Sequence, residues 1–126
     1  MTKINVIPDC GNAPRKTFLK EFNIAFATGD AAFIMEHVAE NILWEMVGDK
    51  VISGKEAFSQ AIQEMKDYTA DELVIEQVIT HGNTAALSGI IKMDGKTYEF
   101  CDVYEFTSAG KNILKHLKSY VIKTKD

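Results

Sequence analysis

The sequence has few of the features that mark secreted, membrane-spanning or nucleic-acid-binding proteins. It holds two cysteines in 126 residues, and Cys10 and Cys101 form no CxxC motif. No apolar run reaches the roughly eighteen residues that a membrane-spanning helix needs, and no apolar segment follows a basic start as in a secretory signal. Acidic residues outnumber basic ones by 18 to 14, so the basic footprint that binds nucleic acid is missing. We therefore expect a cytoplasmic protein with reduced thiols and with neither a membrane nor a nucleic-acid partner.

The composition that remains is that of one ordinary globular domain. Hydrophobic residues make up 46% of the chain and charged residues 25%. A chain of this length can bury a sufficient core without metals or disulfides. Residues 1–13 lack a hydrophobic period and contain Pro8 and Gly11, which predicts an irregular leader. A single domain is expected to follow over residues 14–126.

The hydrophobic pattern predicts three helices in the first half of the chain. Phe18, Phe22 and Phe26 recur every four residues, which places them on one helical stripe. Gly29 and Asp30 read as the end of this helix and the N-cap of the next. The expected helices cover residues 14–28, residues 31 to about 40, and a segment that starts with a capping box at Ser53-Gly54-Lys55-Glu56.

Alternating and β-branched segments predict the strands. Two are expected near the middle of the chain, and four long ones follow in an antiparallel meander with short turns such as Asp94-Gly95. The fold class is thus α+β, a cone-shaped curved antiparallel sheet with three N-terminal helices packed on its concave face. Such a cone has an open end where a pocket can form. The expected strands are 41–47, 51–52, 72–80, 84–93, 96–106 and 113–122.

Asp102 is the most informative polar residue. Period-two alternation places it on one strand face with four aromatic residues, Tyr98, Phe100, Tyr104 and Phe106. An aromatic face belongs inside, where an ionised carboxylate is costly and its pKa rises. A carboxyl that stays neutral can donate a hydrogen bond to a developing oxyanion. Two other interpretations stay open: Asp102 accepts bonds from a hydroxyl and orders the core, or the aromatic face is a dimer interface.

Glu45 is the second candidate carboxyl. It lies in the middle of a strand, between Trp44 and Met46, with Leu43 and Val47 on its own face. Because both faces carry apolar residues, alternation does not decide which one turns inward. The three histidines show no metal-ligand spacing, and we expect neither a metal nor a cofactor.

Three stretches of the chain carry a family resemblance. They are Phe26-Ala27-Thr28-Gly29-Asp30, the segment from Ala39 to Glu56, and Asp102-Val103-Tyr104-Glu105-Phe106 followed by Gly110-Lys111. Together with the element order, they resemble the nuclear transport factor 2-like superfamily over residues 14–122. The closest similarity is to its SnoaL-like and ketosteroid isomerase-like branch. This fold hosts isomerases, cyclases, dehydratases and non-catalytic binders.

The resemblance implies roles for specific side chains. Glu45 falls at the position of the isomerase base and Asp102 at that of the protonated oxyanion donor. Phe22 falls where the family has a tyrosine donor, which removes one hydrogen bond to the oxyanion. The implied reaction moves a proton alpha to the carbonyl of a small apolar ligand, with help from Tyr104 or Tyr120. The expected ligand pocket comprises Phe18, Phe22, Phe26, Phe33, Trp44, Met46, Leu87, Phe100, Tyr104 and Tyr120.

Two rival functions stay open alongside this enzyme hypothesis. The chain can be a non-catalytic carrier or sensor that uses the same pocket, or an interaction domain whose cone is filled by its own side chains. A homodimer through the sheet is expected in each case, because the second sheet face needs a cover and members of the superfamily commonly pair there. The candidate interface residues are Ile75, Ile79, Ile90, Cys101 and Val103.

Overall fold

The computed structural model describes residues 1–9, 11 and 13–125, so the predicted free thiol of Cys10 lies outside the described residues. Within these residues the chain forms three helices and seven strands. Their order is β1 (Lys3–Val6), α1 (Pro14–Thr28), α2 (Ala31–Glu36), β2 (Val38–Met46), β3 (Lys50–Ser53), α3 (Lys55–Met65), β4 (Glu72–His81), β5 (Thr84–Met93), β6 (Lys96–Ser108) and β7 (Lys111–Lys125).

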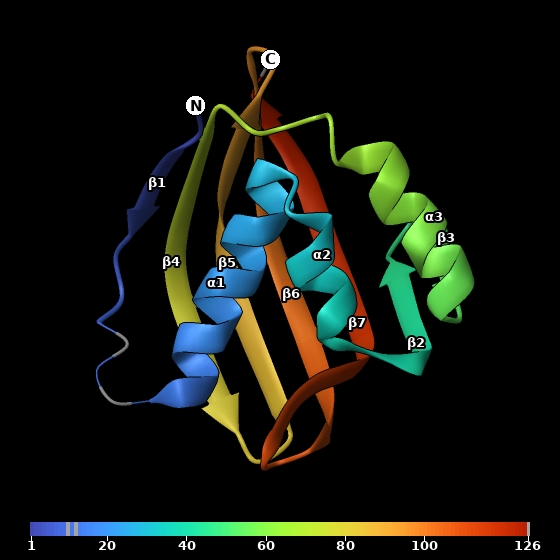
Figure 1. The fold of residues 1–126 in the computed structure, drawn as a ribbon. Helices are drawn as coiled ribbons and strands as arrows, with labels where there is room; N and C mark the ends of the chain where they lie inside the picture. The colour runs from blue at the N-terminus through green and yellow to red at the C-terminus, as the bar shows by residue number, and fades with distance from the viewer. Residues whose placement is uncertain (10, 12, 126) are drawn as a thin grey trace.

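The strands form one curved, unclosed sheet in the order β1-β4-β5-β6-β7-β2-β3. Helices α1 and α2 lie across its concave side, and α3 lies beside β2 and β3 (Figure 1). This confirms the predicted α+β fold and the antiparallel meander of β4 to β7. The sheet is mixed, however, because β1 pairs with β4 and β2 pairs with β7 in parallel. Alternation shows that a segment is a strand, but it does not show which neighbour the strand pairs with.

The predicted irregular leader contains a strand. Lys3 to Val6 pairs with Glu72 to Ile75, and the hydroxyl of Thr2 donates to the carbonyl of Ala70 at 2.7 Å. Ile4 and Val6 pack against the core, while Lys3 and Asn5 face outward. Four alternating residues are too few to distinguish from a loop in the sequence, which explains why the leader was predicted to be irregular.

The helix boundaries partly follow the predicted caps. Gly29 ends α1 with a φ of 79°, and Asp30 caps α2 by accepting a bond from the Phe33 backbone N–H at 3.2 Å. Helix α2 ends at Glu36, earlier than expected, because β2 already begins at Val38. The predicted capping box is wrong: Gly54 is the N-cap of α3, and Ser53 belongs to β3.

The core fills the space between α1 and the concave sheet face. The rings of Phe18 and Phe22 lie 5.6 Å apart, and those of Phe22 and Phe26 lie 5.3 Å apart. Gly89 of β5 is buried opposite Phe100. A Cβ atom at this glycine would lie 3.1 Å from the Phe100 ring and would collide with the backbone carbonyl of Val74. The sheet therefore needs glycine here to let that ring lie flat against it.

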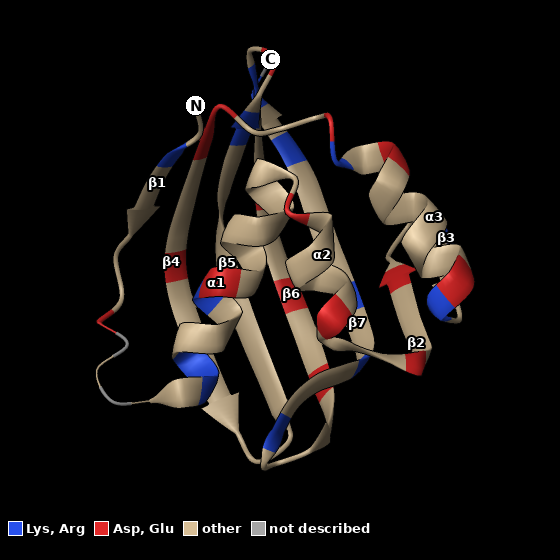
Figure 2. Ribbon diagram, viewed as in Figure 1, with Lys and Arg blue, Asp and Glu red and all other residues tan. Residues whose placement is uncertain are grey.

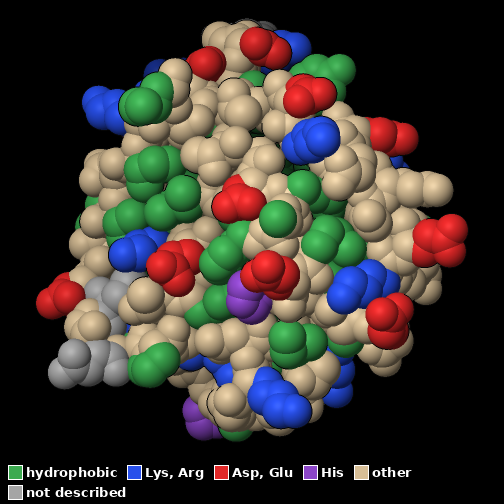
Figure 3. All heavy atoms as spheres, viewed as in Figure 1, with side chains coloured by type: hydrophobic (Ala, Val, Ile, Leu, Met, Phe, Trp, Pro, Cys, Tyr) green, Lys and Arg blue, Asp and Glu red, His purple; other side chains and the backbone are tan. Residues whose placement is uncertain are grey.

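Charged residues of both signs are spread over helices and strands (Figure 2). Strand β7 carries five lysines, at positions 111, 115, 118, 123 and 125, and no acidic residue. On the helix-covered side, apolar side chains appear between acidic and basic ones (Figure 3). No helix of the described residues is long and apolar enough to cross a membrane.

Candidate functional site

A cavity of about 370 Å³ opens on the concave side of the sheet. This volume lies within the range of small-molecule sites, roughly 300–1,000 Å³. Its walls are mostly aromatic and aliphatic, with a small number of polar groups among them. The lining residues are Phe22, Asn23, Phe26, Trp44, Met46, Val47, Asp49, Met65, Leu73, Ile91, Phe100, Asp102, Tyr104, Leu117, Ser119 and Val121.

Strand register orders this lining by depth. Tyr104 pairs with Leu117 at the closed end, where both are at most 2% exposed. Asp102 pairs with Ser119 one step nearer the opening. Val121 follows after another step and is 54% exposed, which places it at the rim. Each two-residue step covers about 7 Å along a strand. Asp102 therefore lies within the cavity, reached from the opening yet enclosed by protein.

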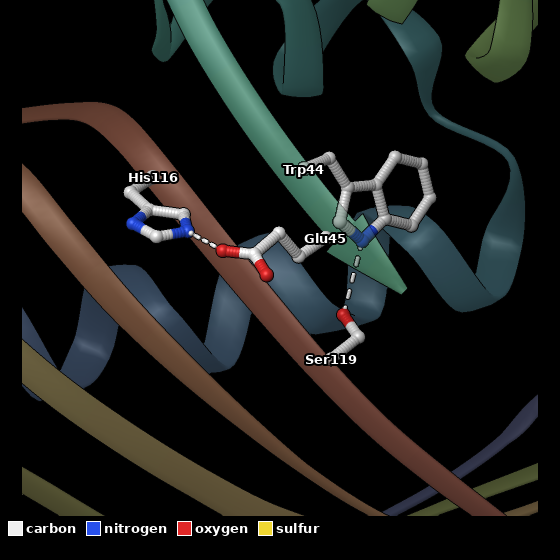
Figure 4. Close-up of polar contacts among 4 residues, drawn as sticks. All are labelled: Trp44, Glu45, His116 and Ser119. Carbon is white, nitrogen blue, oxygen red and sulfur yellow. Dashed lines mark hydrogen bonds and ion pairs between the residues drawn. The ribbon is translucent and has the colours of Figure 1, made fainter. Parts of the chain in front are cut away.

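Ser119 connects Asp102 to Trp44. The indole N–H of Trp44 donates to Ser119 Oγ at 3.0 Å (Figure 4). The indole can only donate, so the hydroxyl proton of Ser119 is free to point elsewhere. It points to Asp102, with which Ser119 shares a side-chain hydrogen bond.

Tyr104 and Asn23 contribute a second chain of donors. The Asn23 amide nitrogen donates to the Leu19 carbonyl and to Tyr104 Oη, each at 2.8 Å. Tyr104 Oη in turn donates to Asp102 Oδ2 at 3.4 Å. Burial and the nearby Asp102 raise the pKa of Tyr104 well above its usual value, so its phenol keeps the proton that it donates. Both chains thus direct their protons toward Asp102.

Asp102 has no cationic partner to balance its charge. Among the described residues that line the cavity, none is Lys, Arg or His. Burial raises the pKa of Asp102 to about 7, while hydrogen bonds from Ser119 and Tyr104 act in the opposite direction. The carboxyl therefore changes its protonation near neutral pH, as the alternation argument expected. A titrating carboxyl in an apolar cavity is a typical acid–base group.

Glu45 does not share this cavity with Asp102. Trp44 and Met46 face inward and line the cavity, so Glu45 projects from the opposite sheet face. Its Oε1 lies 2.8 Å from His116 Nε2, and Figure 4 shows the two side chains on the side of β2 away from Trp44. The predicted pairing of both carboxyls in one pocket is therefore wrong. The sequence did not show which face of this strand turns inward, because apolar residues lie on both faces.

The remaining pocket predictions divide into three groups. Six predicted residues line the cavity: Phe22, Phe26, Trp44, Met46, Phe100 and Tyr104. Phe18 and Phe33 line a separate surface hollow with His37. Leu87 is buried in the core outside the cavity, and Tyr120 lies on the outer face in a hollow shared with Glu45.

Sequence reasoning missed three polar residues of the cavity: Asn23, Ser119 and Asp49. Asn23 follows Phe22 within the apolar stripe of α1, and such an interruption is a usable signal for a buried polar site. Ser119 alternates with Leu117 on the inner face of β7, which is a weaker signal. Asp49 lies in the turn between β2 and β3, where an acidic residue is unremarkable in sequence.

One of the residues predicted for a dimer interface does not lie on the outer sheet face. Ile75 is fully buried in the core, so it is unavailable to a dimer interface. Val103 and Ile79 are 41% and 61% exposed on the outer face.

Cys101 is a half-buried free thiol. Burial raises its pKa most and the charge of Asp102 raises it further, which favours the unreactive thiol form. Within residues 1–9, 11 and 13–125, no cluster of three His, Cys, Asp or Glu side chains is arranged to hold a metal.

Comparisons with known proteins agree with this fold. A putative ketosteroid isomerase from Kribbella flavida superposes with a TM-score of 0.73 at 13% identity, covering 89% of this chain and 80% of that one. An NTF2-like protein of unknown function from Cytophaga hutchinsonii gives 0.68 at 18% identity, covering 89% and 93%. An epoxide hydrolase-like structure from M. tuberculosis gives 0.71 at 14% identity, covering 86% and 82%. At these identities the likeness concerns the fold.

The sequence itself identifies the family. No curated protein matches the chain. Residues 19–115, however, match the model of the SnoaL-like domain, and this range begins within α1 and contains the meander strands β4 to β6 and Asp102. The resemblance drawn from the sequence is thereby confirmed, and the chain belongs to the SnoaL-like domain family.

Proposed function

We propose that the chain binds a small, mostly apolar carbonyl compound in this cavity and that Asp102 donates a proton or hydrogen bond to the carbonyl oxygen. The observation that supports this most is the direction of the hydrogen bonds. Ser119 and Tyr104 both donate to Asp102, and their own oxygens already accept from the Trp44 indole and the Asn23 amide. The proton of the neutral carboxyl is therefore available to a ligand, and a donor in an apolar cavity stabilises a developing enolate strongly.

The reaction class that fits is proton transfer alpha to the carbonyl, as in an isomerase, cyclase or dehydratase. Asp102 is the acid of this scheme, with Ser119 and Tyr104 as donors behind it. Glu45 is not its base, because that carboxylate pairs with His116 on the other sheet face, so the proton removed from the alpha carbon passes to solvent water. The position of Glu45 outside the cavity favours a second candidate function, a non-catalytic carrier or sensor that holds the same class of ligand without turnover.

Exchange at the ligand separates the two candidates. Aryl ketones and ketosteroids are incubated with the protein in D₂O, and NMR follows deuterium incorporation at the carbon alpha to the carbonyl. Binding is followed in parallel by the fluorescence of Trp44, which lines the cavity and is the one tryptophan in the sequence. Accelerated exchange supports the enzyme, whereas binding without exchange supports the carrier.

Two matched variants test the role of Asp102. Asp102→Asn is expected to slow exchange by about 10²–10³-fold, the usual effect of removing an oxyanion donor. Glu45→Gln is the control, since it removes a carboxylate on the far side of the sheet, and its exchange rate is expected to change less than twofold. Equal rates in Asp102→Asn and the unaltered chain would contradict the proposal.

We also propose that the outer sheet face pairs with a second copy of the chain. Ile79, Val103 and Tyr120 expose apolar surface there, next to the Glu45–His116 and Lys115–Glu105 pairs, so the face carries both charge signs and can complement itself. Light scattering after size exclusion is expected to give twice the chain mass, and Val103→Lys is expected to give the monomer. A monomer at high concentration of the unaltered chain would remove this proposal.

A cytoplasmic location is a further part of the proposal. The free thiol of Cys101 fits a reducing compartment. Cell fractionation with a tagged chain tests it, and recovery from the secreted or membrane fraction contradicts it.

A further inference from the structure

The geometry points to Asp49 as a specificity residue that selects ligands whose outer end carries an ammonium or hydroxyl group and that disfavours ligands whose outer end is anionic. This inference deepens the proposed function, because it assumes a ligand that reaches Asp102 with its carbonyl end. It assigns chemistry to the opening of the cavity, which the proposal above leaves undefined.

Asp49 is an unpaired carboxylate at the rim. It lies in the turn between β2 and β3, where its backbone N–H donates to the Met46 carbonyl at 2.9 Å. It lines the cavity together with Val47 and Met65, whose side chains are 46% and 42% exposed. Within the described residues, the Asp49 side chain makes no hydrogen bond or ion pair. The turn therefore holds a free negative charge at the entrance.

No positive group of the cavity offsets this charge. The described lining residues include two carboxyls, Asp49 and Asp102, and no basic side chain. Lys50 and Lys118 line the neighbouring hollow on the outer side, which Asp49 also borders. A ligand inside the cavity thus meets the Asp49 carboxylate at the rim, apolar walls and one acid, whereas a carboxylate or phosphate at its outer end would meet the like charge of Asp49.

The intervening walls fix the shape of the preferred ligand. Besides Asp102 and Asp49, the cavity presents the aromatic side chains of Phe26, Trp44 and Phe100. Such walls bind a flat or aliphatic body, and their ring faces also attract a nearby ammonium group. The substrate class is therefore a bipolar molecule with a carbonyl at the buried end, an apolar body, and a cationic or hydroxyl group at the exposed end.

A matched ligand series tests this inference. The probes are acetylnaphthalenes whose distant ring carries an aminomethyl, hydroxymethyl, methyl or carboxymethyl group, and binding is read from Trp44 fluorescence. The ammonium probe is expected to bind roughly tenfold more tightly than the carboxylate probe, because charge interactions at an exposed rim are modest. This ratio is expected to shrink with added salt.

Variants assign the preference to Asp49. Asp49→Asn is expected to bring the ammonium and carboxylate probes to within about twofold, and Asp49→Lys to reverse their order. Asp67→Asn is the matched control, because Asp67 is an exposed carboxylate outside the cavity and its loss changes the net charge equally. The inference is overturned when the unaltered chain shows no preference, when Asp49→Asn keeps it, or when Asp67→Asn removes it as well.

A second comparison keeps the two hypotheses apart. Each probe is also measured with an ethyl group in place of acetyl, which removes the oxygen meant for Asp102. A retained tail preference with equal affinity of acetyl and ethyl probes would overturn the proposed function and leave the role of Asp49 standing. The opposite pattern, with acetyl preferred and all tails equal, would overturn the role of Asp49 alone. No binding of any probe would contradict both.

Discussion

Asp102 and Glu45 are two carboxyls on opposite faces of the same sheet, and their surroundings differ sharply. Asp102 pairs in register with Ser119, and Glu45 pairs with the adjacent residue Lys118 on the same strand, β7. The inner carboxyl is enclosed by apolar walls and accepts only neutral donors, whereas the outer one is 33% exposed and lies against His116. The same chemical group thus becomes a group that titrates near neutrality on one face and a surface ion-pair partner on the other. A shift of one residue along a strand moves a side chain to the other face of the sheet and so decides which of these environments it has.

The largest expected difference between the two is in the pH dependence of stability. The pKa of Asp102 is about 7 in the folded chain against an ordinary value of 3.8, so the folded state retains a proton that the unfolded state has lost. The stabilisation that Asp102 contributes is fully present below its pKa in the unfolded state. It is lost as the pH rises through its pKa in the folded state. The free energy of unfolding is expected to fall by about 2–3 kcal/mol between pH 5 and pH 8.

Urea unfolding of two variants across that pH range checks this prediction. Asp102→Asn cannot ionise at this position, so its stability is expected to vary less with pH than that of the unaltered chain. Glu45→Gln is expected to keep the full slope. A slope that survives in Asp102→Asn would show that other groups cause it.

The next effect concerns the donors behind Asp102. Ser119→Ala removes a hydrogen bond that lowers the pKa of Asp102 and leaves the Trp44 indole N–H without its acceptor. We expect the pKa of Asp102 to rise further and the unfolding free energy to drop by about 1–3 kcal/mol. Carboxyl-carbon NMR and urea unfolding measure the two quantities. The control is Ser88→Ala, whose hydroxyl bonds Gln77 on the exposed outer side, and the same loss there would contradict the comparison.

The smallest effect is expected at the outer pair. Removing the Glu45–His116 contact by Glu45→Gln is expected to change the unfolding free energy by less than about 1 kcal/mol, since partly exposed ion pairs contribute little. The pKa of Asp102 is expected to stay at about 7 in this variant. A shift of that pKa would show that the two faces are coupled through β7, against the separation described above.

Much of the fold was predictable from local patterns. Strand β5 was predicted with both ends correct, because turns at Gly82 and Asp94-Gly95 bound this segment on both sides. The parallel pairing of β2 with β7 was not predictable, since it joins segments some seventy residues apart and local pattern carries no information about partners. β1 was missed for the related reason that four residues become a strand only through their contacts with β4.

The residues of the candidate site could likewise be predicted from local patterns only in part. Asp102 could be found because five alternating positions, four of them aromatic, leave one choice of face. Glu45 could not, because Leu43 and Val47 on its own face are as apolar as Trp44 and Met46 on the other. The roles of Asn23 and Ser119 depend on Tyr104, Trp44 and Asp102, which lie far from them in the chain or across a strand pair. Hydrogen-bond partners of this kind are a property of the folded chain.

Gly89 ties the wall of the cavity to the pairing of the sheet. This glycine does not line the cavity, yet the Phe100 ring that does line it rests 3.1 Å from where a side chain on Gly89 would begin. A side chain there would also meet the backbone carbonyl of Val74, which belongs to the neighbouring strand β4. Space for the Phe100 ring and the pairing of β4 with β5 therefore depend on the same missing Cβ atom. A position that contacts no ligand thus constrains both the wall of the cavity and the strand behind it.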